Sequence, residues 1–243
     1  MPKHSHHISR RGLMMMASAA LLSRATAADP ADYLGNASRH RPLTASMPPG
    51  ALGQARLAGR GPVAGYFQPI QITGPGSTQF ALSNSGSFAD ANPVLQAGLL
   101  IGAVYRFRIT RIPLAEGAEL YPTVEAIDRT FPPAGLAWKY PIQIQLDQED
   151  LDAALAGRMV TRVIYLEDPQ TATPMLQTPA TRRPMEISSF QDPLEVADRL
   201  GRPVAIVRIG SVTPPRSPQL MPQFLFGDPQ WAPNPQPDST SQP

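Results

Sequence analysis

The fold is decided by the stretch Tyr105-Arg106-Phe107-Arg108-Ile109-Thr110, in which apolar and polar side chains alternate. A period of two places Tyr105, Phe107 and Ile109 on one face of a strand and the arginines on the other. One buried and one solvated face are typical of an antiparallel sheet. The alternation therefore predicts a half-buried antiparallel strand over residues 99–112.

Further strands are predicted on both sides of this one. They are expected at residues 65–72, at 78–82, around Phe88 and at 121–127. Pro69 favours an edge position for the first of them, because proline cannot donate to a sheet ladder. On the polar face of the central strand, Arg106 and Arg108 are expected to pair with Glu125 or Asp128 as a solvated charge set.

The second half of the chain predicts two helix–strand units. Asp147 and Asp192 stand where helix N-caps are expected, Pro193 suits the first helical position, and Gly157 and Gly201 suit the helix ends. The acidic run that follows Asp147 fits helix capping better than a calcium loop, since the loop glycine is absent. Strands are expected at residues 142–146, 160–166 and 204–209.

These elements predict one mainly β domain over residues 63–210, a sandwich-like assembly of antiparallel sheets with two short helices. Residues 28–62, rich in Ala, Gly, Pro and Arg, are predicted to be a disordered leader. Residues 168–189 are expected to form a surface loop. The last 33 residues, 211–243, hold nine prolines and are predicted to be a disordered tail.

The N-terminus has the pattern of a cleavable signal peptide over residues 1–27. A polar, basic segment ends at Arg10 and Arg11, an apolar stretch follows over residues 13–22, and Ala25 and Ala27 suit the cleavage site. The arginine pair favours the twin-arginine route over the general secretory route. The apolar stretch is too short for a membrane span, which needs about 20 residues. We therefore expect an exported, periplasmic or extracellular protein without a stable span after cleavage.

Charge and composition narrow the chemistry. Four of the 21 Lys and Arg residues lie in residues 1–27, and the other 17 are fewer than the 19 Asp and Glu residues. Nucleic-acid binding is therefore not expected, because it needs clustered basic residues. The chain has no cysteine, and His4, His6 and His7 precede the predicted cleavage site. We predict no metal site and no cofactor.

Catalysis is not favoured by the residues that remain after cleavage. A serine hydrolase needs a base, and only His40 and Lys139 are available after residue 27. Paired carboxylates stay open as an alternative, because a glycoside hydrolase requires two acids at a set separation. The candidates are Glu116, Glu119, Glu125 and Asp128.

Two sets of aromatic residues are candidates for binding. A carbohydrate-binding module presents a row of exposed rings, and the candidates for such a row are Tyr66, Tyr121, Trp138 and Tyr140. Aromatic residues between prolines in the C-terminal tail suit a short docking motif for a partner. That motif would comprise Phe224, Phe226 and Trp231.

Four segments carry a resemblance to one family, and they are residues 105–109, 120–125, 160–169 and 192–209. The chain resembles a group of uncharacterised exported proteins of planctomycete-type bacteria over roughly residues 63–210. The resemblance implies a shared domain and a cell-envelope setting, and it brings no activity or ligand. We therefore predict a non-catalytic structural or interaction protein of the envelope, whose partner is an envelope protein or a polysaccharide. The carbohydrate-binding module and the glycoside hydrolase remain as alternatives.

Overall fold

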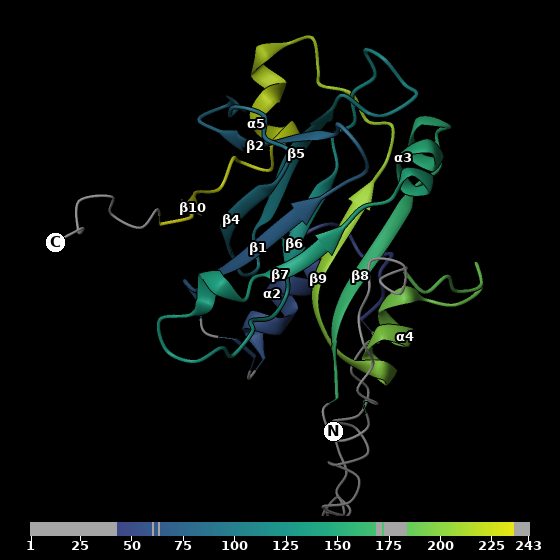
Figure 1. The fold of residues 1–243 in the computed structure, drawn as a ribbon. Coiled ribbons are helices and arrows are strands. Elements are labelled where there is room, and N and C mark those ends of the chain that lie inside the picture. The colour runs from purple at the N-terminus through teal and green to yellow at the C-terminus, as the bar shows by residue number, and fades with distance from the viewer. Residues whose placement is uncertain (1–42, 60, 63, 169–171, 173–183, 236–243) are drawn as a thin grey trace, which may run out of the picture. The chain divides into compact units, whose positions relative to one another are not determined.

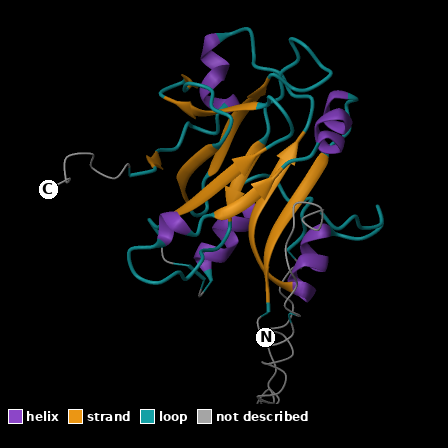
Figure 2. Ribbon diagram, in the orientation of Figure 1, coloured by secondary structure: helices purple, strands orange, loops and turns teal. Residues whose placement is uncertain are grey.

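Two β-sheets form the framework of the described structure (Figures 1 and 2). The computed structural model describes residues 43–59, 61, 62, 64–168, 172 and 184–235, all within one compact unit of residues 42–243. Residues 1–27 and the larger part of the predicted surface loop lie outside the described residues. Among those described, no helix is long and apolar enough to cross a membrane.

The larger sheet has six strands in the order β3-β2-β5-β6-β9-β8. Their bounds are β2 (Gln79–Asn84), β3 (Ser87–Phe88), β5 (Val104–Thr110), β6 (Thr123–Ala126), β8 (Val160–Glu167) and β9 (Gly201–Ile209). Neighbouring strands are antiparallel throughout. The strand predicted over residues 99–112 is only partly present: β5, in the middle of this sheet, begins at Val104. Residues 99 and 100 end another strand, β4 (Leu95–Leu100), and a turn at residues 101 and 102 separates the two.

The alternation of β5 sets the core, as predicted. Tyr105, Phe107 and Ile109 are fully buried. They pack in one cluster with side chains of the smaller sheet, among them Ile70 and Leu99. Because a single core joins the inner faces of both sheets, the prediction of a mainly β, sandwich-like fold is confirmed.

The smaller sheet is mixed rather than wholly antiparallel, in the order β10-β4-β1-β7. Its strands are β1 (Phe67–Thr73), β4 (Leu95–Leu100), β7 (Ile142–Gln145) and β10 (Trp231–Pro233). The pairing of β1 with β7 is parallel, whereas both pairings of β4 are antiparallel. The long connection from β1 to β7 lets the chain return in the same direction, which short turns do not allow.

Pro69 lies in a central strand, so the predicted edge position of β1 is wrong. The hydrogen bond from Ile101 N to Tyr66 O sets the register, which turns the backbone nitrogen of Pro69 away from β4. On that other side β7 pairs with β1 only from Ile70 onward. The missing N–H of Pro69 therefore interrupts no ladder.

Both predicted helices are present, as α3 (Gln148–Leu155) and α4 (Pro193–Leu200). Asp147 caps α3 in a reciprocal capping box with Asp150, and Asp192 accepts from two amides of the first turn of α4. Two further α-helices, α2 (Ala51–Ala58) and α5 (Met221–Phe224), and two 3₁₀ turns, η1 (Ala137–Lys139) and η2 (Pro218–Leu220), were not predicted. Helices α2 and α5 lie in the segments for which disorder was expected.

The predicted leader is ordered over residues 43–59, which corrects the boundary at residue 63. Leu52 of α2 and Ala45 are buried, and they pack with Ile127, Leu194 and Ile206. The apolar surface that this segment needs in order to fold is supplied by residues far along the chain. Composition within the segment alone therefore underestimates its order.

The predicted tail is ordered over residues 211–235, and its proline content misled the prediction. Leu225 is fully buried, and β10 pairs with the free edge of β4. The indole Nε1 of Trp231 donates to Ser83 O of β2 at 2.9 Å. Proline suits an added edge strand and short turns, and these are the structures that the tail forms.

Candidate functional site

The larger sheet carries a row of four polar residues on the face opposite to the one that bears Tyr105, Phe107 and Ile109. Arg106 of β5 stands opposite Thr123 of β6, and Thr123 stands opposite Arg208 of β9. Thr161 of β8 completes the row opposite Arg208. Directly opposed residues share one face of a sheet, so guanidinium and hydroxyl groups alternate across four strands.

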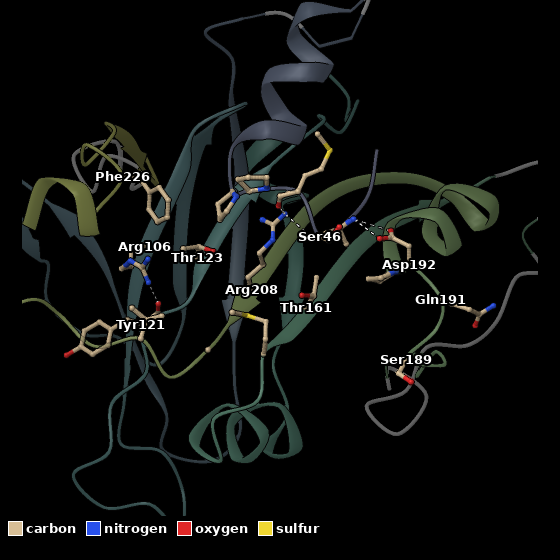
Figure 3. Close-up of a pocket in the computed structure, with 18 of the residues that line it drawn as sticks. Ser46, Arg106, Tyr121, Thr123, Thr161, Ser189, Gln191, Asp192, Arg208 and Phe226 are labelled. Atoms are coloured by element: carbon tan, nitrogen blue, oxygen red, sulfur yellow. Dashed lines mark hydrogen bonds between the residues drawn. The ribbon is translucent and has the colours of Figure 1, made fainter. Parts of the chain in front are cut away.

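This row forms the floor of a cleft of about 760 Å³ (Figure 3). Residues 45–49 form one wall, and residues 189–193, before and at the start of α4, form another. Arg106 lies at one end beside Phe226, and Asp192 lies at the other end. The walls are largely apolar, and their apolar members include Met47, Pro48, Pro49, Met159, Phe190, Val212 and Phe226.

Arg106 is held by carbonyl groups and by aromatic rings. Its Nε donates to Phe224 O at 2.7 Å, and its Nη1 donates to Tyr121 O. The guanidinium carbon lies 4.2 Å from the ring centre of Phe224 and 5.1 Å from that of Phe226. Burial lowers the pKa of Arg106 to about 10, because desolvation disfavours the charged form. The group is still charged at neutral pH.

Arg208 in the middle of the row is bound to its own chain. Its Nη1 lies 3.4 Å from Glu125 Oε2, and its Nη2 donates to the carbonyls of Ala45 and Met47 at 3.4 and 3.3 Å. Glu125 is fully buried and also accepts hydrogen bonds from the amides of Gly50 and Gly53 at the start of α2. Arg208 and Glu125 therefore fix the wall of the cleft formed by residues 45–49.

Asp192, at the other end of the cleft, also holds the wall formed by residues 45–49. Its carboxylate accepts from the amides of Leu194 and Glu195 as the cap of α4, and it also accepts from Ala45 N at 2.9 and 3.1 Å. Both ends of the wall are thus attached by carboxylates to the sheet and to α4. Of the two arginines in the floor, Arg106 is the one that is not paired with an acid among the described residues.

The predicted pairing of Arg106 and Arg108 with Glu125 or Asp128 is wrong. Arg108 lies 3.9 Å from Glu119, whereas Arg208 and Arg202 pair with Glu125 and Asp128. The strand register is the reason, because it sets Thr123 opposite Arg106 and Val104 opposite Glu125.

The four candidate sugar-binding rings lie in different environments. Tyr121 is buried between Phe88 and Phe224, with ring centres 5.5 and 5.7 Å away. Tyr66 is half-buried under the guanidinium of Arg129 at 5.4 Å, and Trp138 is half-buried in η1. Tyr140 is the exposed member, beside Lys139. Among the described residues no ring contact joins any two of these four aromatic side chains.

The candidate docking residues of the tail contact their own domain. Phe224 and Phe226 stack on Arg106, and Trp231 is hydrogen-bonded to β2. Phe226 also lines the cleft. The candidate signal residues Arg10, Arg11, Ala25 and Ala27 lie outside the described residues.

The four candidate catalytic carboxylates do not form a facing pair. Glu125 and Asp128 are each bound to a different arginine, Asp128 at 2.7 Å from Arg202. Glu119 accepts from the hydroxyl of Tyr121, and Glu116 is exposed. Burial, followed by the neighbouring Glu119, raises the pKa of Tyr121 to about 12. Within the described residues no cluster of three or more His, Cys, Asp or Glu side chains is placed to hold a metal ion.

Sequence reasoning missed the row on the sheet, although it left a signal. Arg208 interrupts the apolar run of residues 204–209, and a charge at such a position usually has a partner. The register that aligns the four residues of the row depends on three strand pairings. Comparison of the chain with protein-family models, with curated proteins and with solved structures gave no match.

Proposed function

We propose that this protein is an exported, non-catalytic binding protein of the cell envelope, and that the cleft holds its ligand. The observation that supports the proposal is the floor of the cleft, where donors from four strands stand in one row. Ligand pockets typically measure about 300–1,000 Å³ and combine an apolar lining with a few placed polar groups. The cleft has both properties.

The lining favours binding over turnover. Asp192 is the one carboxylate among the described lining residues, and its oxygens accept backbone hydrogen bonds. The lining hydroxyls of Thr123 and Thr161 stand next to guanidinium groups rather than next to a base that would activate them. The export and envelope parts of the proposal depend on the signal-like pattern of residues 1–27.

Filling the cleft tests the proposal. Thr161→Trp places a large ring on the floor, and tryptophan suits a strand. Leu166→Trp introduces the same ring into the same strand, at an exposed position that does not line the cleft. Ligand-observed NMR of the full chain against a library of small organic molecules should show binders for the wild type and for Leu166→Trp. We expect Thr161→Trp to lose at least about tenfold in affinity for them.

Two results would contradict the proposal. One is a wild type that binds no member of the library while remaining folded by circular dichroism. The other is a set of binders whose affinity is the same in Thr161→Trp as in Leu166→Trp.

A further inference from the structure

Arg106 is exceptional among the buried charged residues of the described structure. The others are Glu125, Asp128 and Asp150. Each of these three has an arginine within 3.4 Å. Buried charges are normally paired, because an unpaired charge keeps its desolvation cost. Arg106, which is 8% exposed, has no carboxylate within 4.0 Å among the described residues.

The donors of Arg106 are only partly used. Nε and Nη1 donate to two backbone carbonyls, which fix the plane of the guanidinium, and Nη2 makes no hydrogen bond to a described residue. The carbonyls carry no net charge, so the positive charge is oriented without being neutralised. In Figure 3 the guanidinium lies between Phe226 and Tyr121, with Thr123 on the side that faces Arg208.

The cleft determines which anion would fit. Arg208 is already paired with Glu125, so within the part of the chain that the structure describes the floor has one unpaired positive charge. One charge suits a monoanion better than a phosphate dianion, which needs several donors. Met159, Val212 and Phe226 give the space around it an apolar lining.

We propose that the ligand of this cleft is a small molecule with one carboxylate and an apolar body, and that Arg106 binds the carboxylate. This inference rests on the proposed function and specifies its ligand class. In this proposal Nη2 of Arg106 donates to one carboxylate oxygen, and the second oxygen is assigned to the hydroxyl of Thr123, which stands opposite Arg106 in the row. The apolar body lies along Met159 and Val212.

Matched pairs of probes test the charge directly. N-acetyl-leucine and its amide stand for a peptide C-terminus, and decanoate and decanamide stand for an acyl chain. Titration of the full chain by calorimetry should show that the acid of at least one pair binds about tenfold or more tightly than its amide, because a hydrogen bond to a charged group is lost in the amide. The pair that shows the preference identifies the source of the carboxylate.

Variants show which residue causes the preference for the acid over the amide. Arg106→Met should bind acid and amide alike, whereas Arg199→Met, the same change at an exposed residue of α4, should keep the wild-type ratio. Because Arg106 also holds the carbonyl of Phe224, a second variant is needed. Thr123→Val keeps the shape of the strand and should weaken the binding of the acids severalfold, and more than it weakens the binding of the amides.

The outcomes separate the inference from the proposal beneath it. If the wild type binds acids and amides equally, the proposed carboxylate ligand is wrong, and the cleft binds neutral ligands instead. An unchanged preference in Arg106→Met would also overturn it. Binding of neither pair, together with no library binder sensitive to Thr161→Trp, would overturn both.

Discussion

Tyr105 is the residue at which the two sheets and the C-terminal segment meet. Its ring lies in the core beneath β5, and its hydroxyl accepts from Leu100 N of β4 at 2.9 Å. The same hydroxyl donates to Gln230 O, next to β10, at 2.7 Å. Burial raises the pKa of Tyr105 to about 12, and the hydrogen bond from Leu100 opposes the shift only in part. The neutral phenol is therefore part of the folded state.

This shift predicts how stability changes at alkaline pH. Unfolding returns the pKa of Tyr105 from about 12 to 10.0, so its contribution is complete below pH 10 and is lost as the pH rises towards 12. A pKa difference of about two between the folded and the unfolded state corresponds to roughly 2–3 kcal/mol of stability. We expect Tyr105→Phe to lose about 1 kcal/mol at pH 7 from its hydrogen bonds. Its further loss of stability between pH 10 and 12 should be smaller than that of the wild type.

Urea unfolding at pH 7, 10 and 11.5 measures both effects. The control is Tyr140→Phe, which removes an exposed hydroxyl and should follow the wild-type curve. A Tyr105→Phe variant with the full alkaline loss of the wild type would show that this phenol does not couple to folding.

Helix α2 is held on the sheet by one buried carboxylate and one close backbone contact. Glu125 of β6 accepts from two amides at the start of the helix, where the helix dipole favours a negative charge. Gly53 lies so near Gly102 that a Cβ on Gly53 would come 2.5 Å from the Cα of Gly102. Arg208 balances the charge of Glu125 from β9. The position of α2 thus depends on residues from three other parts of the chain.

Replacing the carboxylate by an amide isolates this contribution. Glu125→Gln leaves Arg208 without its anion, and breaking a buried ion pair costs about 3 kcal/mol or more. Glu195→Gln makes the same change in the exposed pair with Arg199 and should cost less than about 0.5 kcal/mol. Denaturant unfolding at neutral pH gives both values. Equal losses in the two variants would mean that Glu125 is not the anchor of α2.

At the scale of the whole molecule, the segments on either side of residues 63–210 are part of the folded domain. Residues 43–59 bring Leu52 and Ala45 into the interior, and the C-terminal segment brings Leu225 and β10. A chain cut to residues 63–210, the domain predicted from sequence, would expose the partners of these side chains. We expect this chain to lose cooperative thermal unfolding, whereas residues 43–235 should melt like the full chain. Cooperative melting of the shorter chain would show that the two ends are only accessory.

A feature could be predicted from the sequence when the residues that form it lie close together along the chain. The buried apolar face of β5 and the caps of α3 and α4 depend on residues within a few positions of each other, and these predictions are confirmed. The expected solvation of the opposite face of β5 is wrong at Arg106, which is buried. Glu125 and Gly53 are 72 positions apart, and Arg208 and Ala45 are 163 apart. Local periodicity holds no information on such pairs. The cleft was missed for that reason, and so was the order of the two ends.

The late position of β10 has a consequence for how the chain folds during synthesis. The contacts of Trp231 with β2 and β4 span most of the described chain, and the edge of β4 stays open until residue 231 has left the ribosome. Folds that depend on such distant contacts form slowly, on a scale of milliseconds to seconds. An elongating ribosome adds about 5–20 residues per second. Synthesis of the roughly 130 residues between β4 and β10 therefore takes several seconds at this rate, and β4 cannot gain its β10 neighbour before residue 231 has been made.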